Sequence, residues 1–126
     1  MKKNNPWLEF ATEDYETIQS LQNTNLYRSI CFHAQQTVEK ILKAYLFSID
    51  SHILRIHDIS QLFLETGLDL PNEMTQKDLE FLSSIYIETR YPPDIGLLST
   101  GNPDKIDANR AIKNAEILFN FILNNL

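Results

Sequence analysis

Apolar residues recur at steps of three and four along nearly the whole chain, which is the spacing of one face of an α-helix. Polar stretches that contain proline, glycine or asparagine separate five such segments, and we expect helices over residues 6–21, 25–49, 57–66, 75–90 and 104–126. Pro6 suits a first helical turn, and Gly67 suits a left-handed cap after the third helix. Residues 75–78, "TQKD", resemble a capping box for the fourth. The pattern predicts an all-α fold, an antiparallel up-and-down bundle of four to five helices in a single domain over residues 1–126.

Composition narrows the class of protein. With 126 residues, 43% of them hydrophobic and only three glycines, the chain can form a packed core, and a loop-rich β fold is disfavoured. The single cysteine, Cys31, lies inside a helical pattern, where we expect a small buried side chain in a reducing cytosol. No run approaches the roughly 20 apolar residues that cross a bilayer, and the first ten residues do not resemble a signal peptide. We therefore expect a cytoplasmic protein that has no membrane segment.

The net charge of −6 excludes binding to nucleic acid through bulk electrostatics. Any contact with a nucleotide or with RNA has to come from a local cluster of basic and polar side chains.

Residues 25–49 offer such a cluster. On a wheel with about 100° per residue and Ile30 at zero, the apolar positions of this helix fall within about 120° and form a core stripe: Ala34, Val38, Ile41, Leu42, Tyr45 and Ile49.

Four polar side chains lie one above another on the opposite side of the wheel, between about 220° and about 300°: His33, Gln36, Lys40 and Lys43. Phe32 and Phe47 flank or enter this sector, although a face exposed only to water would not need them. Lysines supply charge, glutamine and histidine supply directional donors, and aromatic rings can stack a base. The pattern is compatible with a groove for an anion, with a solvated face and with a dimer face.

Three ordered blocks of sequence resemble the HEPN domain, the higher eukaryotes and prokaryotes nucleotide-binding domain. They are "YRSICFHAQQTVEKILKAYL" at residues 27–46, "HDISQL" at 57–62 and "YIETRYPPD" at 86–94, after a first helix with Trp7, Ala11 and Asp14. The likeness covers nearly the whole chain. It implies a bundle of four or five helices that commonly dimerises and associates with nucleotides or RNA. It also implies a small nucleotidyltransferase as partner, in a prokaryotic toxin–antitoxin or related system.

Some branches of that family are ribonucleases, and these use an arginine followed, after four to six residues, by a histidine. Arg28 and His33 have this spacing, but a step of five residues turns a helix by about 140°, so the two side chains diverge. The family's motif lies late in the domain, where the arginine would be Arg90. None of the three histidines (His33, His52 and His57) follows Arg90. The ribonuclease motif is therefore absent from its usual place, which argues against catalysis and leaves binding open.

The predicted nucleotide- or anion-binding site has five members: His33, Gln36, Lys40, Lys43 and Arg90. The two lysines could hold phosphate as point charges or pair with acids such as Glu39. His33 could contact a ligand or form a structural hydrogen bond beneath the turn at Arg90. Arg90 precedes two prolines that stiffen the chain, and its guanidinium could grip a phosphate or a carboxylate from a neighbouring helix.

Four further residues support this prediction: His57, Asp58, Tyr86 and Tyr91. Asp58 stands at a helix start, where a carboxylate interacts favourably with the helix dipole. His57 and Asp58 then have a capping and core role, and a general base formed by the pair is the alternative. Tyr86 lies one turn before Arg90 and could stack or pack. Tyr91 is an acceptor for nucleotidylation only by analogy with related systems.

Three functions remain open at this point. The first is a non-catalytic HEPN module that forms a homodimer, binds nucleotide or RNA and works with a nucleotidyltransferase. The second is a metal-independent endoribonuclease toxin with a displaced centre built from Arg28, His33 or Arg90. The third is a structural dimerisation or interaction module. The histidines lack the spacing of metal ligands and no glycine-rich phosphate loop is present, so we expect neither a metal nor a cofactor.

Overall fold

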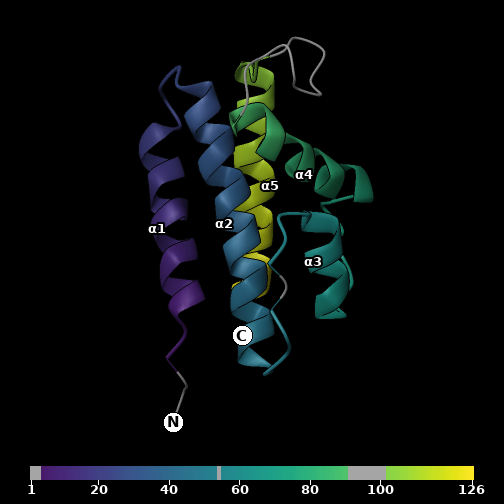
Figure 1. Ribbon diagram of the computed structural model, residues 1–126. Helices are drawn as coiled ribbons and strands as arrows, with labels where there is room; N and C mark the ends of the chain where they lie inside the picture. The colour runs from purple at the N-terminus through teal and green to yellow at the C-terminus, as the bar shows by residue number, and fades with distance from the viewer. Residues whose placement is uncertain (1–3, 54, 91–101) are drawn as a thin grey trace.

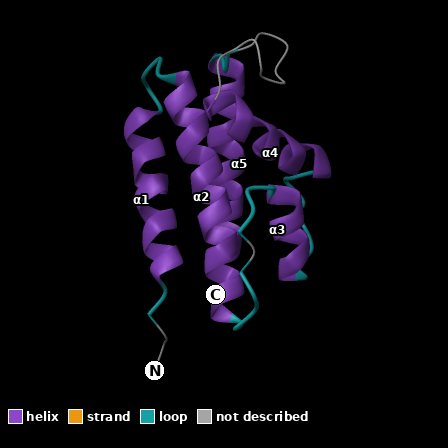
Figure 2. Ribbon diagram, viewed as in Figure 1, coloured by secondary structure: helices purple, strands orange, loops and turns teal. Residues whose placement is uncertain are grey.

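The computed structural model describes residues 4–53, 55–90 and 102–126, and for residues 86–90 it describes the backbone alone. Within these ranges the chain forms helices and no strand (Figure 2). The five helices are α1 (Pro6–Leu21), α2 (Tyr27–Ser48), α3 (Ile59–Thr66), α4 (Gln76–Arg90) and α5 (Lys105–Leu123). The all-α prediction is confirmed, and each helix begins and ends no more than three residues from its expected position.

The three long helices α1, α2 and α5 lie side by side, and α3 and α4 pack beside α2 (Figure 1). α1 and α2 are antiparallel, so that the Nδ2 of Asn5 at the start of α1 donates to the carbonyl of Ala44 near the end of α2, at 2.9 Å. α3 and α4 return the chain to the end where α2 begins. α5 therefore starts beside the first turn of α2 and runs along it in the same direction (Figure 1).

Side chains in the connecting segments set the helix boundaries. Asn5 Oδ1 accepts from the backbone N–H of Leu8, and Pro6 follows it in the first turn. Asp58 caps α3 in the same way through Gln61, and Gly67 ends that helix with a φ of 72°, as its position in the sequence predicted. At the start of α4 the backbone N–H of Thr75 donates to Asp78 Oδ2 at 3.0 Å. This hydrogen bond is one of the two in a capping box: the side chain of the third helical residue, Asp78, accepts from the backbone N–H of the capping residue, Thr75.

α5 has a complete capping box that the sequence analysis did not identify. Asp104 Oδ1 accepts from the N–H of Asp107 at 2.9 Å, and Asp107 Oδ2 accepts from the N–H of Asp104 at 3.1 Å. The two hydrogen bonds satisfy donors that the first turn of a helix leaves without an intrahelical partner. An aspartate at the last position of the box replaces the more usual glutamate or glutamine.

α2 is the central helix of the core, and its predicted apolar stripe is buried from Ile30 to Leu42. The stripe ends earlier than predicted, because Tyr45 is half-buried and Ile49, which follows the last helical residue, is exposed. Cys31 is fully buried, as predicted, and burial raises the pKa of its thiol to about 12. A thiol in this state is an inert packing residue.

Candidate functional site

The polar side of α2 is covered by neighbouring elements instead of facing water. Gln35, Gln36, Glu39 and Lys43 are all buried, although each has a strongly polar side chain. α1 covers one edge of this side and the segment before α3 covers the other. Polar groups in such a position are costly unless each has a partner, and the described side chains form two clusters in which each has one.

The first cluster is centred on Asp14, which α1 places against α2. Asp14 is 8% exposed, and each of its carboxylate oxygens holds one nitrogen from α2. His33 Nδ1 lies 2.9 Å from Oδ1, and Lys40 Nζ lies 2.6 Å from Oδ2. A carboxylate only accepts, so Nδ1 of the imidazole carries a proton, and Nε2 is an acceptor in the neutral ring and a donor in the imidazolium ion. We call Asp14, His33 and Lys40 the Asp14 cluster.

The Asp14 cluster lies near the surface and beside aromatic rings. The side chains of His33 and Lys40 keep 30% and 25% of their surface exposed. Phe10 is 51% exposed, and Lys40 Nζ lies 5.9 Å from the centroid of its ring, within reach of a cation–π contact. The ring of Phe32 meets that of His33 edge-on at 5.0 Å. Nitrogen groups and an exposed ring are thus presented together at one surface.

The second cluster is centred on Glu39 of α2, and its lysine–carboxylate pair is more deeply buried, whereas the side chain of its histidine is 47% exposed. Lys43 Nζ lies 3.2 Å from Oε2 of Glu39, and Lys43 and Glu39 are 5% and 4% exposed. His57, just before α3, brings its Nδ1 to 2.6 Å from Oε1. Gln35 Nε2 donates to the same oxygen at 3.3 Å. We call Glu39, Lys43, His57 and Gln35 the Glu39 cluster.

Two further contacts enclose the Glu39 cluster. Gln36 Nε2 donates to Gln35 Oε1 at 2.7 Å, which orients the Gln35 amide toward the carboxylate. The ammonium group of Lys43 lies 5.2 Å from the centroid of Trp7, so the indole of α1 covers the ion pair. The cluster thereby ties α2 to α1 and to the start of α3.

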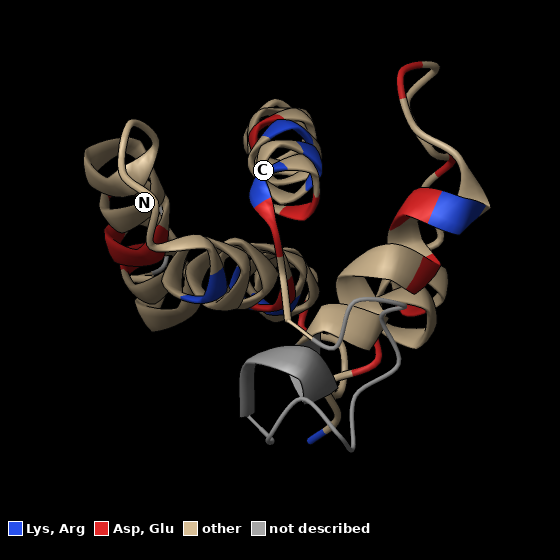
Figure 3. Ribbon diagram, turned by 90° about the horizontal axis from the view of Figure 1, so that it is seen from above, with Lys and Arg blue, Asp and Glu red and all other residues tan. Residues whose placement is uncertain are grey.

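Each cluster has one carboxylate for one ammonium group, so with neutral imidazoles neither carries a net charge. Seen from above, the blue segments of the described helices are interspersed with red ones (Figure 3), and α1 and α3 contain no lysine or arginine. A ligand at either cluster would therefore be held by short directional contacts and not by a strong positive field.

The structure distributes the predicted site residues over these clusters. His33 and Lys40 belong to the half-exposed Asp14 cluster, whereas Lys43 and Gln36 are buried in or against the Glu39 cluster. The alternative that Lys43 pairs with Glu39 is the geometry observed. The side chains of Arg90 and Tyr86, and all of Tyr91, lie outside the described residues. Their place relative to either cluster stays a prediction.

The supporting residues His57 and Asp58 do not pair with each other in the contacts that the structure describes. His57 contacts Glu39, whereas Asp58 caps α3 and accepts from Ser83 Oγ at 3.3 Å. A capping role for Asp58 is what its position at a helix start predicted.

Sequence reasoning named Glu39 as an alternative partner of the lysines, but it did not predict that Asp14 holds His33 and Lys40. Asp14 was visible as an acid that recurs at the apolar spacing of the first helix, a position that faces the core. Gln35 stands close to the apolar stripe on the wheel, which is a second signal of a buried polar group. Arg28, the arginine with ribonuclease-like spacing, donates to Asn102 at 3.0 Å, while His33 contacts Asp14. The two side chains point to different neighbours, in agreement with the divergence expected on a helix.

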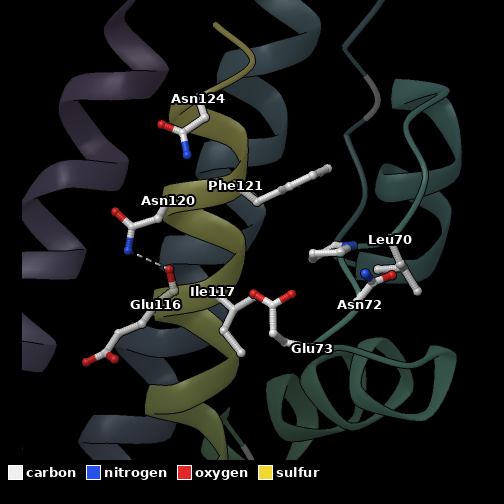
Figure 4. Close-up of a pocket in the computed structure, with 9 residues that line it drawn as sticks. Leu70, Asn72, Glu73, Glu116, Ile117, Asn120, Phe121 and Asn124 are labelled. Carbon is white, nitrogen blue, oxygen red and sulfur yellow. Dashed lines mark hydrogen bonds between the residues drawn. The ribbon is translucent and has the colours of Figure 1, made fainter.

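A larger cavity lies elsewhere, between α5 and the segment that joins α3 to α4. Its volume is about 560 Å³. Its lining includes Glu73, Glu116 and three asparagines, and no lysine or arginine. Figure 4 shows Glu116 and Asn120 directed away from Glu73 and Leu70, so these polar groups do not converge on one point. A phosphate would find two carboxylates there and no counter-charge.

The described residues form neither a cluster of metal ligands nor a membrane-spanning helix. Within residues 4–53, 55–90 and 102–126, no group of three or more histidine, cysteine, aspartate or glutamate side chains could hold a metal ion. Among the helices so described, none has the length and apolar character required to cross a membrane.

Comparison with known proteins decides the family. The family model of the HEPN domain matches residues 5–126. The chain belongs to the HEPN family. A HEPN relative from Methanocaldococcus jannaschii, named as candidate toxin MJ1304, is 32% identical over 123 residues, which cover 87% of this chain and 79% of the relative.

Two crystal structures resemble the whole HEPN chain. TT1696 from Thermus thermophilus has a TM-score of 0.82 at 25% identity and covers 100% of both chains. ST0689, described as an archaeal HEPN homologue, has a TM-score of 0.73 at 27% identity, with 99% of this chain and 98% of the other covered. The resemblance proposed from the three sequence blocks is confirmed.

Proposed function

We propose that this HEPN protein is a component of a toxin–antitoxin-like system, that it binds nucleotide or RNA, and that it works with a nucleotidyltransferase partner. The family match over residues 5–126 supports the general role, and the relative named as a candidate toxin favours this kind of system. The absence of any histidine after Arg90 favours a binding module over an endoribonuclease.

The assignment of the binding site rests on the solvent-exposed part of the Asp14 cluster. Asp14 uses only Nδ1 of His33 and one direction of the Lys40 ammonium group. Nε2 of the imidazole and further N–H groups of the lysine therefore remain for a ligand. The exposed ring of Phe10 beside them suits a stacked base. Of the five residues predicted to bind an anion, we assign His33 and Lys40 the direct contacts.

Lys43 has a different place in this proposal. Its ammonium group is buried against Glu39 and Trp7, so it holds the cluster together from behind the surface. Gln36 acts likewise by orienting Gln35. Arg90 remains a proposed contributor, since it ends α4 and its guanidinium could complete a phosphate contact.

Nucleotide binding is tested with a single substitution, Lys40→Ala, in the purified full chain. We expect affinity for ATP or for a short single-stranded RNA, measured by calorimetry, to fall by about tenfold, equivalent to about 1.4 kcal/mol. Circular dichroism should show unchanged helicity, because Lys40 is half-exposed. The matched control is Lys113→Ala, which removes an exposed lysine of α5 and should leave binding as it was. Equal affinity in both variants would remove the site assignment.

The partner is tested by co-expression with a nucleotidyltransferase whose gene adjoins that of this chain. Growth arrest by the HEPN protein alone, relieved by the partner, is the expected result. The competing ribonuclease function predicts cleavage of labelled RNA by the purified chain, and we expect that RNA to stay intact. Cleavage that His33→Ala abolishes would favour the ribonuclease instead.

A further inference from the structure

A separate polar cavity of about 280 Å³ lies where the turn between α1 and α2 meets the first turns of α5. This is the upper end of the molecule in Figure 1, where α1, α2 and α5 come together. Besides Thr24, its polar lining consists of four amides, one ring and one lysine: Gln22, Asn23, Asn25, Tyr27, Lys105 and Asn109. We call these six residues the amide groove. Its size is just below the roughly 300–1,000 Å³ range of small-molecule sites.

The amide groove has an unusual charge for this chain. The protein has 17 acidic residues, yet among the described residues that line the groove the charged side chain is Lys105, and no carboxylate takes part. The acids nearest in sequence, Asp104 and Asp107, direct carboxylate oxygens at each other's backbone N–H groups in the capping box. An adjoining cavity of about 290 Å³ shares Asn25 and Tyr27 and adds Arg28. A second basic residue therefore lies next to Tyr27 in the lining of the adjoining cavity.

The side chains fit a planar ligand with alternating donors and acceptors. Each amide offers one carbonyl and one NH₂ group, the combination that pairs with two adjacent atoms on the edge of an adenine. Ile30 is buried and Tyr27 half-buried in the lining, which provides apolar surface against which a ring can lie. Lys105 at the rim supplies a point charge for phosphate.

From these contacts we propose that the amide groove binds a purine nucleotide, with the base among the amides and against Tyr27 and the phosphate at Lys105. The cavity of about 560 Å³ has the opposite character, since Glu73 and Glu116 belong to its described lining and no lysine or arginine does. The amide groove shares no residue with the Asp14 cluster, so this site stands whether or not that cluster binds a ligand. A free nucleotide and the terminal nucleotide of an RNA present the same chemistry.

The test is an NMR titration of the ¹⁵N-labelled full chain with three probes: AMP, the RNA dinucleotide ApA with a 5′-phosphate, and ribose 5-phosphate. We expect AMP to shift the amide signals of residues 22–27 and 105–109, including the side-chain NH₂ groups of Asn23 and Asn109. Lys105→Met and Asn109→Leu should each weaken that binding by about tenfold. Lys113→Met, two turns further along α5, should not. A dinucleotide that binds more tightly than AMP assigns the groove to an RNA end, and the reverse assigns it to a free nucleotide.

Two outcomes would overturn the proposal. One is the absence of shifts in residues 22–27 and 105–109 at millimolar AMP. The other is equal binding of ribose 5-phosphate and AMP, because the amide side chains would then make no contribution to binding of the base. Lys40→Ala is included as a further variant. Loss of binding in Lys40→Ala with an unchanged response in Lys105→Met would place the nucleotide at the Asp14 cluster alone, which separates failure of this inference from failure of the proposed function.

Discussion

The Asp14 cluster and the Glu39 cluster use the same three chemical groups at two depths in the molecule. In each, one carboxylate holds the Nδ1 of a histidine and the ammonium group of a lysine from α2. The lysine of the Asp14 cluster keeps 25% of its side chain exposed, whereas that of the Glu39 cluster keeps 7%. The difference arises because Trp7 covers Lys43, while Lys40 lies beside the exposed ring of Phe10.

Depth decides what such a cluster can do. A charge near the surface is partly solvated, so breaking its ion pair costs little and a ligand can compete for its hydrogen bonds. A buried charge depends on its partner, because the medium around it stabilises it poorly. The Asp14 cluster therefore suits binding, and the Glu39 cluster suits holding α1, α2 and the start of α3 in place.

The largest expected effect is that of Glu39→Ala. It would leave the ammonium group of Lys43 buried without a counter-charge and would also remove the acceptor of His57 and Gln35. Loss of one member of a buried pair costs about 3–5 kcal/mol. Urea unfolding followed by circular dichroism measures the change. The matched control is Glu80→Ala, an exposed glutamate of α4, which should change stability little. Equal effects of the two substitutions would contradict the importance of burial.

The double substitution Glu39→Gln with Lys43→Met sharpens the same comparison. The amide still accepts from His57, and the methionine fills the space under Trp7 without a charge. Exchanging a buried pair for groups that need no counter-charge is often close to neutral. We therefore expect the double variant to be more stable than Glu39→Ala by about 2 kcal/mol or more, measured by the same urea unfolding. A double variant as unstable as Glu39→Ala would show that the loss came from packing.

Asp14→Ala should have an intermediate effect. The carboxylate is buried and accepts two hydrogen bonds, but Lys40 and His33 can turn toward water when it is lost. Hydrogen bonds to a charged group contribute about 1.5–3 kcal/mol each, and solvation of the released partners reduces the net loss to about 1–2 kcal/mol. If Asp14→Ala shifted the urea midpoint as much as Glu39→Ala does, the difference in burial between the two clusters would not determine the cost of losing the carboxylate.

Much of this architecture could be predicted from the sequence, because local patterns determine it. The periodicity of apolar residues located all five helices, and Pro6, Asp58 and Gly67 marked boundaries that the structure has. The partners of the polar side of α2 were harder to predict. His33 and Lys43 are only ten positions apart on one helix, but their carboxylates come from different elements, α1 and α2. Helix spacing gives the direction of a side chain, and only the packing of α1 and α3 gives what it meets.

The finest distinction concerns Lys40→Ala, for which we expect the smallest change in stability. The ion pair with Asp14 is short, at 2.6 Å, but a quarter of the lysine side chain meets water. Pairs of this kind contribute at most about 1 kcal/mol, and salt weakens them further. Urea unfolding at low and at high salt should therefore give a small difference in the free energy of unfolding between Lys40→Ala and the native chain, and this difference should shrink as salt is added.

If the variant instead lost as much stability as Glu39→Ala, Lys40 would be a structural residue and its surface would not be available for a ligand. A small loss of stability together with a clear loss of nucleotide affinity is the combination that a binding residue predicts and a buried ion pair does not.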